Sequence, residues 1–391
     1  MSQVSIDAIL TAARSVMPAG TASAALHEPW FHGREWEYVK ECIDSGWVSS
    51  AGKYVNRFET ALAEFTGARH AVAVVNGTAA LHVSLQLVGV QPGDEVLVPT
   101  LTFIATANAV SYCGAKPHFI DCSDITLGVD PIKLGDYLRE ITAVRNGITV
   151  NKLTGAPIRA MVPMHAFGHP VDMDALIELA ARFKIEVVED AAESLGSLYK
   201  GRQTGTLGRI AALSFNGNKV ITTGGGGAIL TSDEELGRRA KHITTTSRVA
   251  HRWSFIHDEV GYNYRLPNLN AALGCAQIET LPESLARKRL LAERYETAFR
   301  EVSGVKFFRE PVFARSNYWL NTILLDADCS ASRDALLDTL NADQIMARPV
   351  WTLMHRLPMF QDCECMPLNT AEDIERRLLN LPSSPFLALP Q

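Results

Sequence analysis

Two residues that can carry chemistry follow apolar segments of the chain. Lys219 comes after the apolar run 211–215, within SFNGNKVITTGGGG, and before Gly224–Gly227. Asp190 ends the apolar run 185–189. A lysine on a tight turn after a buried strand can lose its hydration, which makes its amine nucleophilic toward carbonyl compounds. The same stretch also suits a β-hairpin with a surface lysine, so the rest of the chain must decide.

Two further features stand at the ends of expected strands. Gly77 and Thr78 lie between a strand and a helix, where free backbone N–H groups can bind an anion, and Phe103 follows a strand at 95–99. Each is ambiguous alone, as a turn, a core residue or, for Asp190, a helix cap. Together with Lys219 they match the needs of pyridoxal phosphate. That cofactor requires an amine, an acid beside its pyridine nitrogen, a phosphate site and a flat stacking group.

The elements that must position these residues alternate along the chain. Apolar runs predict seven strands, at 71–75, 95–99, 117–121, 160–164, 185–189, 211–215 and 228–230. Helical patterns separate most of them, which predicts an α/β domain with a mostly parallel sheet and its site at the carboxyl ends of the strands. After residue 230 helices dominate, including one at 268–279 and a separate long one after Pro282. Asp172 and Ser332 are expected to cap helices, and 146–155 to be a polar loop.

Composition excludes several classes of protein. The 391 residues are 47% hydrophobic and 20% charged with a net charge of −6, which argues against a nucleic-acid or anionic-membrane partner. No apolar run reaches the roughly 18 residues of a membrane-spanning helix. The first 20 residues lack a secretory signal pattern and predict a short amphipathic helix that packs on the body or on a partner subunit.

The cysteines and histidines do not predict a metal site. Seven cysteines, an odd number in mostly apolar surroundings, suit a reducing cytoplasm better than a disulfide framework. Cys363 and Cys365 are too close for the usual zinc knuckle. His165 and His169 have a metal-ligand spacing, but the neighbouring Gly168 and Pro170 make the segment a loop. We therefore expect no metal.

The chain resembles the DegT family of pyridoxal-phosphate-dependent nucleotide-sugar aminotransferases. The resemblance runs from about Trp36 to the C-terminus and rests on NGTAALHVSL, PTLTFIATANAV, EDAAESLGS, SFNGNKVITTGGGGAIL and GYNYRLPNLNAALG. It implies the type I aspartate-aminotransferase fold: a large domain with a seven-stranded, mostly parallel mixed sheet flanked by helices, and a smaller α+β C-terminal domain. We expect an N-terminal helical segment at 1–33, a large cofactor-binding domain at 34–260 and a small domain at 261–391.

The resemblance also implies a role for each site residue. Lys219 would form the Schiff base and shuttle the proton, and Asp190, with a lowered pKa, would pair with the pyridine nitrogen. The remaining implied contacts are Phe103 stacked on the ring, Gly77, Thr78 and Ser214 on the phosphate, and Asn263 reaching the phosphate of the neighbouring subunit in a homodimer. Glu193 stands near the phenolic oxygen, where a hydrogen bond would need a shared proton, so its role stays open. Many members carry an acidic residue in the glycine run, whereas this chain has Thr-Gly-Gly-Gly-Gly, a tighter turn.

The implied reaction moves the amino group of L-glutamate to a nucleotide-linked keto sugar. Glutamate becomes 2-oxoglutarate and leaves pyridoxamine phosphate, which aminates the ketone. GYNYRLPN and LNLPSSP resemble enzymes that aminate C4 of a 4-keto-6-deoxy hexose for bacterial surface glycans such as the lipopolysaccharide O-antigen. UDP is favoured over GDP. The alternatives are a 3-dehydratase, whose members carry histidine in place of the lysine, and a non-catalytic cofactor-binding regulator.

Overall fold

A seven-stranded sheet forms the largest layer of the computed structural model, which describes residues 5–389. The strand order is β1-β11-β10-β7-β6-β2-β3, and neighbours run parallel except at β11, which is antiparallel to β1 and β10. This mixed, mostly parallel sheet confirms the fold class expected from sequence. The strands are β1 (His70–Val74), β11 (Gly227–Thr231), β10 (Ile210–Ser214), β7 (Glu186–Asp190), β6 (Ile158–Met161), β2 (Glu95–Pro99) and β3 (Lys116–Ile120).

Helices cover both faces of this sheet, because successive strand residues point to opposite faces and both sets are apolar. In β10, Ile210 and Ala212 pack with α4, α5 and α8, whereas Ala211 and Leu213 pack with α2, α3 and α9. Helices α6 and α7 pack against strands β2, β3, β6 and β7. The helices are α2 (Glu35–Ser45), α3 (Lys53–Thr66), α4 (Gly77–Leu87), α5 (Ile104–Tyr112), α6 (Pro131–Ile141), α7 (Met173–Phe183), α8 (Glu234–Thr244) and α9 (Asn268–Phe299).

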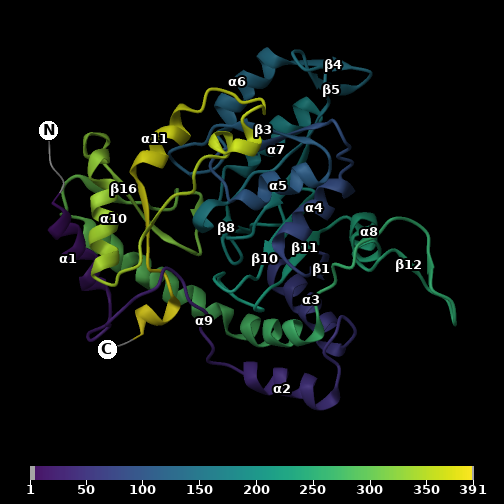
Figure 1. Ribbon diagram of the computed structural model, residues 1–391, viewed down its shortest axis with the longest axis horizontal. Helices are drawn as coiled ribbons and strands as arrows, with labels where there is room; N and C mark the ends of the chain where they lie inside the picture. The colour runs from purple at the N-terminus through teal and green to yellow at the C-terminus, as the bar shows by residue number, and fades with distance from the viewer. Residues whose placement is uncertain (1–4, 390–391) are drawn as a thin grey trace.

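A four-stranded antiparallel sheet of order β14-β16-β18-β17 forms a second, smaller layer (Figure 1). Its core includes Ile9 and Ala13 of α1, which confirms that the N-terminal amphipathic helix packs on the body. The elements are β14 (Val305–Phe307), β16 (Asn321–Leu325), β17 (Arg348–Pro349), β18 (Leu378–Leu381), α1 (Ile6–Val16), α10 (Arg333–Ala342) and α11 (Asn369–Arg377).

Helix α9 corrects one sequence expectation. It is a single 32-residue helix that continues through Pro282, where two helices were expected. Its first half packs in the core of the large sheet, through Ile278 and Leu281, and its second half packs beside the small sheet, through Leu291 and Tyr295. This burial on both sides outweighs the roughly 3 kcal/mol that an interior proline costs a helix. Figure 1 shows α9 running beneath both layers.

Smaller differences from the sequence expectations have local causes. The stretch 146–155, expected as a polar loop, contains β5 and the turn that joins it to β4 in a hairpin. Asp172 precedes α7 but accepts from the Tyr199 hydroxyl at 2.6 Å instead of capping the helix. Ser332 precedes α10 without a capping bond. The remaining strands are β4 (Thr142–Arg145), β5 (Ile148–Asn151), β8 (Leu198–Tyr199), β9 (Arg202–Gln203), β12 (Arg248–Val249), β13 (Ile256–His257) and β15 (Ala314–Arg315).

The division into 1–33, 34–260 and 261–391 stays a prediction. Its outermost residues, 1–4 and 390–391, lie outside the described residues. Helix α9, which this division gives wholly to the small domain, contributes to the cores of both layers.

Candidate active site

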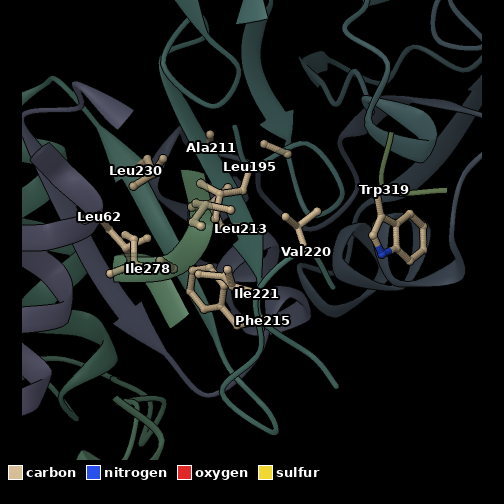
Figure 2. Close-up of a cluster of buried hydrophobic side chains, with 14 of the residues drawn as sticks. Leu62, Leu195, Ala211, Leu213, Phe215, Val220, Ile221, Leu230, Ile278 and Trp319 are labelled. Atoms are coloured by element: carbon tan, nitrogen blue, oxygen red, sulfur yellow. The ribbon is translucent and has the colours of Figure 1, made fainter. Parts of the chain in front are cut away.

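Lys219 lies in the turn that joins β10 to β11. Its backbone N–H donates to the Asn216 carbonyl at 3.0 Å, and the turn is closed where the Phe215 N–H donates to the Gly226 carbonyl at 2.8 Å. Phe215, Val220 and Ile221 on either side are buried in the apolar cluster shown in Figure 2. These buried neighbours fix the turn, so the lysine stands on a hairpin but not at the surface: its side chain is 12% exposed.

Two side chains hold the amine of Lys219. Its Nζ lies 3.2 Å from Oε1 of Glu193 and 3.9 Å from the centroid of the Trp319 ring. The Trp319 indole N–H donates to the Asn218 carbonyl at 2.7 Å, which ties the ring to the same turn. The ammonium is therefore held by one carboxylate and one aromatic face.

Asp190 ends β7 inside the molecule. Its Oδ2 accepts from the Thr106 hydroxyl at 2.7 Å and its Oδ1 from the Ala192 N–H at 3.2 Å. Burial raises the pKa of Asp190, although these bonds and the charge of Lys219 oppose the rise. The lowered pKa expected from sequence therefore requires a cationic partner beyond those that the chain supplies.

Glu193 is a buried carboxyl that bridges two segments. Its Oε2 accepts from the Phe167 N–H at 2.9 Å while Oε1 faces Lys219. Burial raises the pKa of Glu193 to about 7, against the lowering effect of the Lys219 charge. At neutral pH this carboxyl therefore exists in both protonation states and can give or take a proton.

The start of α4 forms an anion cradle beside this carboxyl cluster. The Asn76 side chain caps α4 by accepting from the Ala79 N–H at 2.7 Å, and the first-turn N–H groups of Gly77 and Thr78 have no partner within the helix. A Cβ on Gly77 would lie 2.9 Å from the Ser214 Cβ, and one on Gly227 would lie 2.5 Å from the Asn76 carbonyl carbon. Only glycine permits this approach of helix to strand.

A cavity of 580 Å³ unites seven of the eight residues predicted from sequence: Gly77, Thr78, Phe103, Asp190, Glu193, Ser214 and Lys219. The Phe103 side chain is 47% exposed, as a stacking surface must be. Asn263, the eighth residue, is exposed and does not line the cavity of its own chain.

Sequence reasoning missed four residues around the same cavity. Thr106 bonds Asp190, Trp319 covers Lys219, and Arg348 and Trp351 line the wall that the small layer supplies. For Thr106, its place one helical turn after Phe103 was a signal that the sequence offered. The others lie far along the chain, and no local pattern marks them.

The described residues offer no metal site at the histidines considered from sequence. His165 bonds Glu189 at 3.0 Å, and neither it nor His169 belongs to a group with metal-ligand geometry. One group of that kind is found among residues 5–389: His242, Asp258 and Glu259, where Arg239 already pairs with Glu259. Six cysteines take part in no disulfide: Cys42, Cys113, Cys122, Cys275, Cys363 and Cys365. No helix in the same range combines the length and apolar character needed to cross a membrane.

Residues 31–390 match the model of the DegT/DnrJ/EryC1/StrS aminotransferase family. The chain belongs to this family. It is therefore an aminotransferase-family protein, and the resemblance drawn from its motifs is confirmed. The match spans both layers of the fold and includes the residues named above that line the cavity between them.

Known relatives resemble the chain over nearly its whole length. The GDP-perosamine synthase of Escherichia coli O157:H7 is 39% identical, and the match covers 93% of this chain and 94% of the relative. The putative pyridoxal phosphate-dependent aminotransferase EpsN of Bacillus subtilis is 38% identical, over 92% and 90%. A solved DegT DnrJ EryC1 StrS aminotransferase from Brucella abortus superposes with a TM-score of 0.82 at 26% identity, over 90% and 91%. These likenesses confirm the fold and the enzyme class.

Proposed function

We propose that this protein transfers the amino group of L-glutamate to C4 of a nucleotide-linked 4-keto-6-deoxy sugar, with pyridoxal phosphate as cofactor, in the synthesis of a bacterial surface glycan. One observation carries the proposal: Lys219, Glu193 and Asp190 meet in one cavity with the free N-terminus of α4. An amine, a buried acid and an anion cradle are groups that this chemistry needs, and Glu193 adds a second carboxyl beside the amine.

The residues present fit the cofactor. The Gly77 and Thr78 amides and the Ser214 hydroxyl would hold its phosphate, because Gly77 and Gly227 leave no room for a side chain there. Asp190 would face the pyridine nitrogen, and Phe103 would stack on the ring. When bound, the cofactor supplies an electron sink for the carbon that exchanges its proton. Lys219 moves that proton at Nζ, and Glu193, 3.2 Å away, can exchange a proton with it.

The nucleotide we propose is guanosine diphosphate, which replaces the UDP favoured from sequence. This choice is supported by the similarity to the GDP-perosamine synthase of Escherichia coli O157:H7. The match to that relative covers both layers that enclose the cavity. The choice of C4 rests on the GYNYRLPN and LNLPSSP motifs.

We also infer that the protein is a homodimer in the cytoplasm. The exposed position of Asn263, outside its own cavity, suits a homodimer in which it reaches the partner's site. Seven cysteines, an odd number, suit a reducing cytoplasm better than a disulfide framework. The alternative of a 3-dehydratase is disfavoured because Lys219 is present, and a non-catalytic regulator would not need the paired Lys219 and Glu193.

The test offers the purified enzyme nitrogen-15-labelled L-glutamate and a panel of 4-keto-6-deoxy sugars linked to guanosine, uridine or thymidine diphosphate. We expect a labelled 4-amino sugar and an equal amount of 2-oxoglutarate, identified by mass spectrometry and NMR, with the guanosine substrate preferred. Loss of water from the sugar without label would establish the dehydratase. No reaction with any sugar would defeat the proposed function.

A further inference from the structure

Three polar residues form a row across the small sheet. Arg348 of β17 stands directly opposite Asn380 of β18, which stands opposite Thr322 of β16. Residues opposite each other on antiparallel strands project from the same face. Since Arg348 and Asn380 both line the 580 Å³ cavity, the row occupies the face of the small sheet that closes it.

The cation of this row is not neutralised by an acid. Arg348 is exposed, and its Nη1 donates to two neutral acceptors, the Asn341 side-chain oxygen at 3.3 Å and the Ala347 carbonyl at 3.1 Å. Among the ion pairs of residues 5–389, none involves Arg348, whereas the other cavity cation, Lys219, is paired with Glu193. Arg348 therefore offers the cavity an unpaired guanidinium.

The polar atoms beside it also lack partners. Asn380 is 3% exposed and Thr322 is fully buried, yet within the described chain Oδ1 of Asn380 and Oγ1 of Thr322 have no hydrogen-bond partner. Leaving such groups unsatisfied costs free energy in a monomeric fold. Their neighbours Leu379 and Leu381 pack into the apolar core on the other face. An apolar residue at position 380 would stabilise the sheet better. The polar residues of the row are therefore not explained by packing within the small sheet.

We propose that Arg348 and Asn380, with Thr322 behind them, form the subsite for the anionic group of the substrate. This rests on the proposed function, which supplies two candidate anions: a carboxylate of glutamate and the diphosphate of the nucleotide sugar. A guanidinium binds either oxyanion with paired N–H donors, and the Asn380 amide adds a further donor. The α4 N-terminus serves the cofactor phosphate on the opposite wall, so a second anion needs this second site.

The experiment measures binding by calorimetry with two unreactive probes, glutarate for the donor and GDP for the nucleotide sugar. The cofactor-loaded wild type is compared with Arg348→Met, Asn380→Leu and the control Arg145→Met, an exposed arginine on β4 outside the cavity. We expect Arg348→Met to weaken at least one probe 10-fold or more and Asn380→Leu to weaken the same probe at least 3-fold. The control should bind both within 2-fold of wild type. The probe affected identifies the anion.

Either of two results would overturn the proposal. One is that Arg348→Met binds both probes within 2-fold of wild type. The other is that Asn380→Leu binds normally, which would reduce the row to a lone surface cation. Melting temperatures check the fold, and since Asn380→Leu removes a buried unpaired oxygen, its melting temperature should not fall. No transamination occurs in this binding assay. Absence of amino-sugar product in the labelled-glutamate assay would therefore count against the proposed function, and unchanged binding of both probes here would count against the subsite.

Discussion

The amine of Lys219 lies 3.2 Å from the Glu193 carboxyl, and both groups are enclosed between the large sheet and Trp319. The pair joins a nucleophile to an acid whose pKa of about 7 lets it exchange protons at neutral pH. This relationship supports a place for Glu193, which the sequence alone left without a role, at the proposed reacting centre.

Replacing the lysine tests the centre directly. Lys219→Ala should abolish transamination and still bind pyridoxamine phosphate, because the phosphate cradle at α4 does not depend on the amine. Activity is measured as 2-oxoglutarate formed with the keto-sugar substrate, and circular dichroism checks the fold. Residual turnover above a small fraction of wild type would show that another group forms the covalent bond.

The bond from Thr106 to Asp190 predicts a graded effect on turnover. Asp190→Asn should lower kcat by orders of magnitude, since an amide cannot hold the ring nitrogen protonated. Thr106→Val removes one hydrogen bond to the carboxylate and should lower kcat about 10-fold, the equivalent of roughly 1.4 kcal/mol. Ser111→Ala on the same helix, whose hydroxyl donates to the Ala107 carbonyl, is the control. Equal rates in the valine variant and the control would mean that Thr106 plays no part in holding Asp190.

Glu193 predicts a pH dependence of stability. Its pKa lies near 7 in the folded chain and near 4.5 when unfolded, so between these values the folded state binds more protons. The stability that protonated Glu193 contributes is therefore present below pH 4.5 and lost as the pH rises through 7, by roughly 3 kcal/mol. Urea unfolding at several pH values, without added cofactor, should show this loss in wild type relative to Glu193→Gln. Parallel curves for the two proteins would contradict the raised pKa.

The contact of β11 with the start of α4 predicts a steric effect. Gly227→Ala places a Cβ 2.5 Å from the Asn76 carbonyl carbon, which must push the helix start away from Ser214. We expect a loss of about 1–3 kcal/mol in stability and weaker binding of pyridoxal phosphate. Gly225→Ala, with no atom within 4 Å of the added Cβ, is the matched control and should change stability by less than about 0.5 kcal/mol. Unchanged cofactor affinity in Gly227→Ala would place the phosphate elsewhere.

The position of Asn263 predicts complementation between subunits. Asn263 is exposed, forms an isolated β-bridge with Thr245 and does not line the cavity of its own chain, so it should complete the site of a partner chain. Mixed dimers of Lys219→Ala and Asn263→Ala chains would contain one site with both lesions and one with neither. They should recover activity that both parents lack. If hybrids form and remain as inactive as the parents, Asn263 acts within its own chain or not at all.

The sequence was most informative where chemistry follows local structure. The places of Asp190 at a strand end and of Lys219 in the turn after a strand were predictable, because polar residues begin where each apolar run stops. The structure brings both residues into one cavity. Trp319 and Arg348 reach that cavity from the small layer, and only tertiary packing brings them there. Pro282 misled for the opposite reason: its local preference ends helices, but burial on both sides in two cores keeps α9 continuous.

Helix α9 also connects the two layers that form the walls of the cavity. At 1.5 Å per residue it spans about 48 Å, and its ends are anchored in different cores. Because α9 packs in both cores, we expect the layers that carry Lys219 and Arg348 to move apart when this helix bends. The helix should bend most easily at the turn before Pro282, because the proline ring removes one backbone hydrogen bond there. A movement that admits a bulky substrate would thus pivot there.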